Sequence, residues 1–148
     1  MLARDLATPF PTVGLDTDGL AAVRMLTEQH LPGLLVVDEN EQPHSVLPGS
    51  QVLRFLLPSY IVRDPALARV YDERSADQIT SELTRYRVRD VLPEEPHELP
   101  VLNGDDTTVE IAVAMARLHS PIVAVVEEGR MIGAVTTDAL LTRLLPAA

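Results

Sequence analysis

An internal duplication constrains the fold of this chain more than any other feature of its 148 residues. The tetrapeptide ARDL at residues 3–6 returns as VRDV at residues 88–91, and a proline follows each within a few residues. The same order of predicted elements then repeats after both tetrapeptides, about 90 residues apart. A repeat of this length needs its partner to close a hydrophobic core, so we expect neither half to be stable alone.

Each copy predicts the order β, α, β, β, α. The first helix carries apolar residues at helical spacing and ends at a histidine followed closely by proline, after which a buried strand, a polar turn, a second strand and a second helix follow. The predicted elements of the first copy are Thr12–Leu15, Gly19–Gln29, Leu34–Val37, Ser45–Leu47 and Gln51–Leu57. Those of the second copy are Leu99–Leu102, Thr108–Leu118, Ile122–Val126, Met131–Val135 and Asp138–Leu145.

The pattern predicts a fold of the α/β (α+β) class. We place the first repeat at residues 1–57, a connecting segment at 58–87 and the second repeat at 88–148. The connecting segment lacks glycine and has evenly spread apolar residues, so we predict two helices in it, at Pro65–Tyr71 and Ser75–Tyr86. The connection is either a spacer that covers one edge of the core, or a lid or dimerisation arm.

Composition excludes several classes of function. The net charge is −10 and no run rich in arginine or lysine exists, so we expect no nucleic-acid partner. Cysteine is absent, which excludes disulfides and thiolate chemistry. The start, MLARDLATPF, has no apolar signal-peptide core, and no apolar run approaches the length of a membrane span. We therefore expect a cytoplasmic protein with no direct membrane insertion.

No set of residues predicts catalysis, and we expect the protein not to be an enzyme. The four histidines are far apart in sequence, and the acidic clusters lie in predicted loops. His30 and His119 occupy equivalent positions at the ends of the first helices, which indicates a structural role there. Metal ligation by this pair is the alternative, but we predict no metal site.

The segment Met131–Leu145 predicts the functional site. An apolar strand leads through Thr136, Thr137 and Asp138 directly into a helix. A helix start leaves backbone N–H groups without partners and adds the positive end of the helix dipole, so a phosphate can bind there. Asp138 could instead accept hydrogen bonds from a sugar diol. The alternative is an ordinary N-cap formed by one of the threonines.

Three features point to a known family: the doubled ARDL/VRDV, the paired His-x-Pro segments and above all the pentapeptide IGAVT at residues 132–136. With these features, the chain resembles a tandem pair of cystathionine-β-synthase (CBS) domains, known as a Bateman module. The resemblance covers nearly the whole chain. It implies two CBS repeats packed as a pseudo-two-fold pair, which commonly form flat homodimers. It also implies that AMP, ADP, ATP or S-adenosylmethionine binds between the repeats as a regulatory ligand, with no cofactor required.

The resemblance also implies the residues of the ligand site. Gly133 and Thr136 match the family motif, but its usual aspartate three residues after the threonine is replaced by Ala139, and Asp138 stands one position earlier. Adenine contacts carried over to the second copy fall at Leu99–Leu102 and Pro121–Val123. The implied ligand-binding set is Gly133, Val135, Thr136, Thr137, Asp138, Leu102, Pro121 and Ile122.

The first copy departs further from the motif. Pro48 stands where threonine is expected and Gln51 where aspartate is expected, so we predict one competent nucleotide site and not two. Arg89, Arg130 and Arg143 are the candidates for pairing with phosphates, and for each the alternative is a solvated surface charge.

Two functions follow from the resemblance. The first is a stand-alone regulatory module that senses an adenosine-containing ligand and signals to a partner, such as an enzyme or transporter. The second is a ligand-free dimerisation or interaction module whose nucleotide sites have degenerated. An enzyme that turns over bound nucleotide is a third possibility, for which the sequence offers no residue set.

Overall fold

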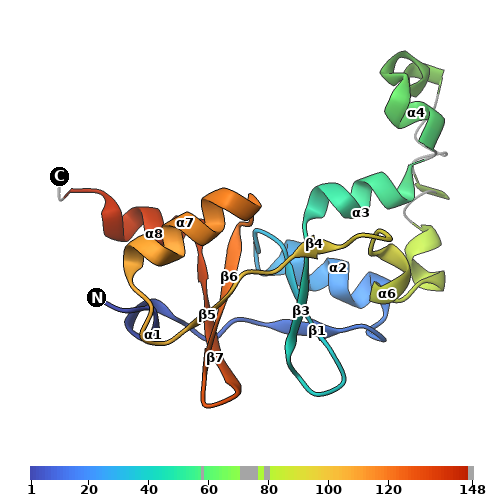
Figure 1. The fold of residues 1–148 in the computed structure, drawn as a ribbon. Helices are drawn as coiled ribbons and strands as arrows, with labels where there is room; N and C mark the ends of the chain where they lie inside the picture. The colour runs from blue at the N-terminus through green and yellow to red at the C-terminus, as the bar shows by residue number, and fades with distance from the viewer. Residues whose placement is uncertain (58, 71–76, 79–80, 147–148) are drawn as a thin grey trace.

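We describe the fold from a computed structural model, in which residues 1–57, 59–70, 77–78 and 81–146 are described (Figure 1). The elements of the first half are α1 (Ala3–Leu6), β1 (Thr12–Gly14), α2 (Gly19–Glu28), β2 (Leu34–Val37), β3 (Pro43–Leu47) and α3 (Gly49–Leu56). Those of the second half are α6 (Val88–Val91), β4 (His97–Glu98), β5 (Val101–Asn103), α7 (Thr108–Leu118), β6 (Ile122–Glu127), β7 (Arg130–Thr136) and α8 (Thr137–Leu144).

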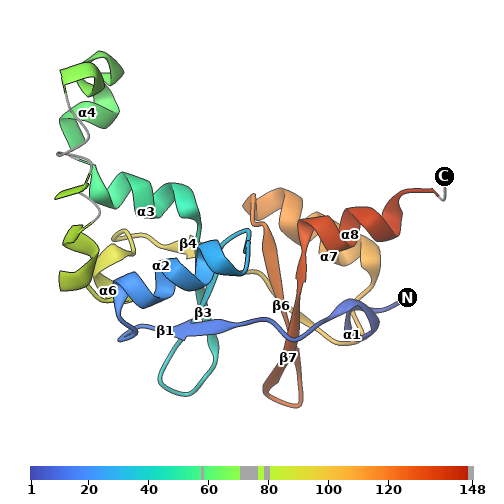
Figure 2. The ribbon, with the colours of Figure 1, turned by 180° about the vertical axis from the view of Figure 1, so that it is seen from behind.

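The two halves form two sheets that lie side by side (Figures 1 and 2). The first sheet has the order β1-β2-β3-β4, and the second has the order β5-β6-β7. In both, the first strand runs parallel to the second, and the second pairs antiparallel with the third. The predicted α/β fold with a doubled unit is therefore confirmed.

Both central strands are buried on both faces because each serves two cores. Leu34 and Val36 of β2 point into the core beneath α2 and α3, whereas Leu35 and Val37 point into a layer between the sheets. The same alternation, as the period of two in a strand requires, divides the residues of β6. The layer between the sheets contains Leu35, Val37, Val46, Leu99, Ile122, Ala124 and Ala134, with Phe10 and Met131 packed against it.

The leading helices α1 and α6 are exchanged between the halves. Ala3 of α1 is fully buried in the core of the second half, and the N–H groups of Ala3 and Arg4 donate to the carbonyls of Asp106 and Gly104 at 2.8 and 2.9 Å. Val88 of α6 is buried in the core of the first half, so each half depends on a segment from the other.

The shared aspartate of ARDL and VRDV has a local reason. Asp5 Oδ2 accepts a hydrogen bond from the Leu2 N–H at 2.9 Å, and Asp90 Oδ2 accepts one from the Arg87 N–H at the same distance. Each carboxylate thereby satisfies a donor at the start of a four-residue helix, which is too short to be stable without such support.

The predicted elements of both repeats are present, and α7 has its predicted bounds. Asp18 caps α2, because its carboxylate accepts from the Ala21 N–H at 3.0 Å. The nearby Asp16 does not cap the helix and instead accepts a hydrogen bond from Arg89 Nε at 2.8 Å. At α7 the Thr107 hydroxyl is the N-cap, since it accepts from the Glu110 N–H at 3.2 Å.

The connecting segment differs from its prediction in the described part. A helix that we did not predict, α4 (Ser59–Arg63), stands apart from the two sheets (Figure 1). Pro65–Val70 forms the 3-10 helix η1, while the predicted last residue, Tyr71, lies outside the described residues. The predicted helix Ser75–Tyr86 also falls partly outside them, and Glu82–Arg85 forms the short 3-10 helix η2. No helix within the described ranges has the length and apolar character needed to cross a bilayer.

The N-terminal segment crosses to the second sheet at a glycine. Thr8 exchanges two backbone hydrogen bonds with Ala134 of β7, at 3.1 and 3.0 Å. A Cβ atom at the neighbouring Gly133 would lie 2.6 Å from the Thr8 carbonyl oxygen, closer than packed atoms approach. Gly133 is therefore required for the crossing, whatever its relation to a ligand.

We predict that Gly133→Ala lowers the free energy of unfolding by about 1 to 3 kcal/mol, because the crossing segment must move away from β7. Urea denaturation measures this. Gly49→Ala is the matched control, since a Cβ there would meet only Leu26 Cδ2 at an ordinary 3.6 Å. The control should be neutral or stabilising by up to about 1 kcal/mol. Equal stability of the two variants would contradict the crossing contact.

Candidate functional site

The start of α8 is capped, as the alternative interpretation of this segment stated. The Thr136 hydroxyl accepts a hydrogen bond from the Ala139 N–H at 3.2 Å, and the Thr137 N–H donates to the Pro121 carbonyl at 3.1 Å. Of the first three N–H groups of α8, only that of Asp138 lacks a hydrogen-bond partner among the described residues. The helix start therefore offers a phosphate fewer donors than the sequence suggested.

The same helix start lines a hollow between the two repeats. Thr136, Thr137 and Asp138 form one wall of it, with Leu141 one turn further along α8. The opposite wall comes from the first half of the chain and consists of Phe10 and the segment His30–Pro32. We call this hollow, of about 600 Å³, the inter-repeat pocket. It joins an apolar wall to a wall of two hydroxyls and a carboxylate.

The end of α2 explains how His30–Pro32 reaches this position. His30 has a left-handed backbone with φ 51°, and the Leu31 N–H donates to the Leu26 carbonyl at 3.0 Å. His119 after α7 has the same φ, and the Ser120 N–H donates to the Met115 carbonyl at 3.1 Å. Such a left-handed residue reverses the chain at a helix end. The predicted structural role of both histidines is therefore confirmed.

Several predicted ligand residues lie outside the inter-repeat pocket. Ile122 is fully buried in the layer between the sheets, and Val135 is fully buried in the core of the second half, where Leu102 packs against it. Gly133 is also buried, against the N-terminal segment. The Pro121 carbonyl accepts from the Thr137 N–H, and Pro121 lines a neighbouring hollow between α7 and α8 that shares Thr137 and Leu141 with the inter-repeat pocket.

Four residues line the pocket that are not among the predicted site residues, namely Phe10, His30, Leu31 and Pro32. The family resemblance implies apolar contacts from the same copy as Thr136, whereas in the structure the residues that face Thr136 across the pocket come from the other copy. A signal existed in the sequence, because His30-Leu31-Pro32 repeats as His119-Ser120-Pro121. In a pair of repeats related by a pseudo-two-fold axis, the strand-to-helix turn of one copy can face the histidine segment of the other.

The equivalent turn of the first copy is built differently. Pro48 stands at the N-cap of α3 and offers no side-chain hydrogen bond. Gln51 donates its N–H to the Pro48 carbonyl at 3.0 Å, and its side chain lines a smaller hollow of about 330 Å³ beside His97. The described lining of this hollow includes a hydroxyl, that of Ser50, but no carboxylate that would match Asp138.

None of the three candidate arginines lines the inter-repeat pocket. Arg89 forms an ion pair with Asp16 at 2.8 Å, which lowers the pKa of Asp16 and raises that of Arg89. Arg130 lies at the start of β7, beside the hairpin turns. Arg143 lies in the last turn of α8, away from the helix start. The described lining is therefore free of basic side chains other than His30.

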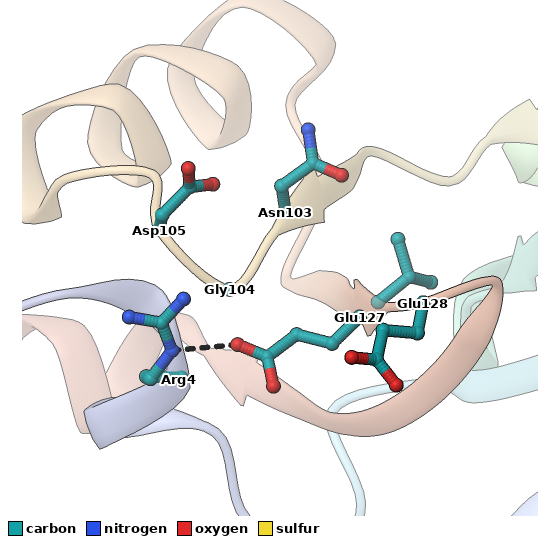
Figure 3. A pocket seen from close by; sticks show the side chains of 7 residues that line it. Arg4, Asn103, Gly104, Asp105, Glu127 and Glu128 are labelled. Carbon is teal, nitrogen blue, oxygen red and sulfur yellow. Dashed lines mark hydrogen bonds and ion pairs between the residues drawn. The ribbon is translucent and has the colours of Figure 1, made fainter.

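A second polar hollow, of about 550 Å³, lies beside α1 and includes Asn103, Gly104 and Asp105 (Figure 3). Across it, Arg4 Nε pairs with Glu127 Oε1 at 2.6 Å, and this hydrogen bond is the main cause that raises the pKa of Arg4. The pair links α1 to the end of β6 and so helps to hold the exchanged helix in place. The described residues contain no cluster of three or more side chains that could hold a metal ion.

Comparison with known proteins identifies the repeat. A family model for the CBS domain matches residues 3–58 and again residues 88–146. A CBS domain-containing protein from Kribbella flavida DSM 17836 is 53% identical, with 97% of this chain and 98% of that chain covered and a TM-score of 0.87. The CBS domain of a membrane protein from Sphaerobacter thermophilus is 26% identical, with 98% and 88% covered and a TM-score of 0.68.

A more distant structure, of CBSX2 in complex with AMP, is 19% identical, with 96% of this chain and 94% of that chain covered and a TM-score of 0.65. At this identity the likeness concerns the fold. Among curated proteins, no sequence matches the chain.

We predict that Thr136→Ala lowers the free energy of unfolding by about 1 kcal/mol, because the Ala139 N–H loses its cap. Thr136→Ser is the matched control, since it keeps the hydroxyl, and it should stay within about 0.5 kcal/mol of the parent protein. Chemical denaturation measures both. If Ser and Ala prove equally destabilising, the hydroxyl is not the capping group.

Proposed function

Because the chain belongs to the CBS-domain family, we propose that it is a regulatory module that binds an adenosine-containing molecule in the inter-repeat pocket and signals to a partner protein. The observation that carries this proposal is the pairing of two unlike walls across the pocket. A purine ring fits against Phe10, Leu31 and Pro32, while a ribose faces Asp138. The AMP complex of the distant relative CBSX2 supports this class of ligand.

The polar wall favours the nucleoside end of the ligand over a long phosphate chain. Asp138 is exposed and carries a negative charge that can accept hydrogen bonds from two ribose hydroxyls. Its own N–H is a donor for one phosphate group, whereas the Thr137 hydroxyl already donates to the Pro121 carbonyl at 3.4 Å. With no arginine among the described residues of the lining and a net charge of −10, a triphosphate would meet uncompensated repulsion. We therefore propose AMP-like or S-adenosylmethionine-like ligands before ATP.

The position of the pocket provides a route to regulation. Its two walls belong to different repeats, and Phe10 packs against the layer that joins their sheets. A ligand that fits one relative orientation of the repeats better than another shifts the population toward that orientation. A partner protein that contacts both repeats would detect this shift. By the family resemblance, the regulated partner protein would be an enzyme or a transporter.

We predict that Asp138→Asn weakens AMP binding about 10- to 100-fold in isothermal titration calorimetry, because charge-assisted hydrogen bonds to the ribose contribute about 1.5 to 3 kcal/mol. Asp105→Asn is the matched control, since this carboxylate is also exposed but lies on the hollow of Figure 3, and it should leave the affinity unchanged. Equal affinities for AMP in both variants would contradict the ribose contact.

A second candidate, an interaction module that works through dimerisation, rests on the outer faces of α7 and α8. Val109 is 67% exposed and Leu144 is 51% exposed, and Val113 and Leu141 are about half exposed beside them. A patch of large apolar side chains on two adjacent helices is typical of a protein interface. We propose that a second copy of the chain covers it, as the family resemblance implies.

We predict that Val113→Glu shifts a homodimer toward monomer in analytical ultracentrifugation, because a charge would be buried in the helix interface. Val70→Glu is the control, since Val70 is 77% exposed on η1 in the connecting segment. If instead only Val70→Glu dissociates the dimer, the connecting segment is a dimerisation arm and the α7–α8 face is not the interface.

A further inference from the structure

The two hairpin turns of the module enclose a hollow distinct from the inter-repeat pocket. The turn between β2 and β3 approaches the turn between β6 and β7, and Gln42 Nε2 donates to the Gly129 carbonyl at 3.1 Å. The turn between β2 and β3 is also ordered internally, since Asp38 Oδ1 accepts from the N–H groups of Asn40 and Gln42 at 2.8 and 3.0 Å. We call the space between them, of about 640 Å³, the hairpin pocket.

The hairpin pocket has an apolar floor. Val37 and Met131 line it from the two central hairpins, and Phe10 lines it from the crossing N-terminal segment. All three belong to or pack against the layer between the sheets. Phe10 also lines the inter-repeat pocket, so it separates the two hollows. A ring or branched hydrocarbon of moderate size would bury its surface on this floor.

The rim of the hairpin pocket carries one charge of each sign. Arg130 begins β7, and Glu41 lies in the opposite turn with a left-handed backbone at φ 61°. Neither side chain has an ion-pair partner within 4.0 Å among the described residues, so both charges are available to a ligand. Thr12, Asn40 and Gln42 add hydrogen-bonding groups to the lining.

We propose that the hairpin pocket binds a free α-amino acid with an apolar or aromatic side chain. Arg130 would pair with its carboxylate, Glu41 with its ammonium group, and the side chain would lie on Phe10, Val37 and Met131. A zwitterion fits the charge of this protein better than an anion does, because it carries no net charge toward a chain of net charge −10. The site is independent of the nucleotide proposal.

The four methionines allow a site-resolved test. Protein labelled with ¹³C at the methionine methyl groups is titrated with L-phenylalanine, and the methyl resonances are followed by NMR. The Met131 resonance should shift in a saturable manner, while that of Met115, which lines the hollow between α7 and α8, should not. An unmoved Met131 resonance at millimolar L-phenylalanine would overturn the proposal.

Variants and analogues test the two charges separately. Arg130→Gln and Glu41→Gln should each raise the Kd for L-phenylalanine about tenfold, whereas Arg143→Gln, an exposed arginine outside the pocket, should not. L-Phenylalaninamide and N-acetyl-L-phenylalanine, which each lack one ligand charge, should bind about tenfold more weakly to the parent protein. Unchanged resonances of the other methionines show that the variants are folded. Equal affinity of parent and Arg130→Gln would overturn the assignment.

Discussion

The apolar layer between the two sheets is the contact on which the rest of the structure depends. β2 and β6 each direct alternate side chains into this layer, so neither sheet can leave it without exposing buried leucine, isoleucine and valine. The exchange of α1 and α6 reinforces it, because each half completes its own core with a helix from the other. The two repeats of the sequence are therefore one folding unit in space.

This arrangement also determines where the inter-repeat pocket lies. The N-terminal segment must cross from the first sheet to β7, and it does so past Gly133, with Phe10 placed between the repeats. The start of α8 therefore faces the end of α2 across the inter-repeat pocket. Sites with walls from both repeats are sensitive to how the repeats lie relative to each other, which is the property that a regulatory module needs.

The sequence predicts the elements well because their signals are local. Apolar runs located β2 and β6, and apolar residues at helical spacing located α7. The site was harder to predict because its partners meet only through the tertiary fold. Nothing near Thr136 indicates that His30–Pro32 lies opposite, and the Pro121 carbonyl that occupies the Thr137 N–H is likewise a non-local partner. The exchange of α1 is equally invisible in the order of the repeats.

A crystal structure of the chain with AMP tests the central claim most directly. The account predicts that adenine lies against Phe10 and Pro32, and that a ribose hydroxyl lies within hydrogen-bonding distance, about 2.6 to 3.2 Å, of the Asp138 carboxylate. Both repeats would then contact one nucleotide. AMP bound elsewhere, for example beside Gln51 of the first copy, would contradict the account, and so would crystals grown at millimolar AMP with the inter-repeat pocket free of nucleotide.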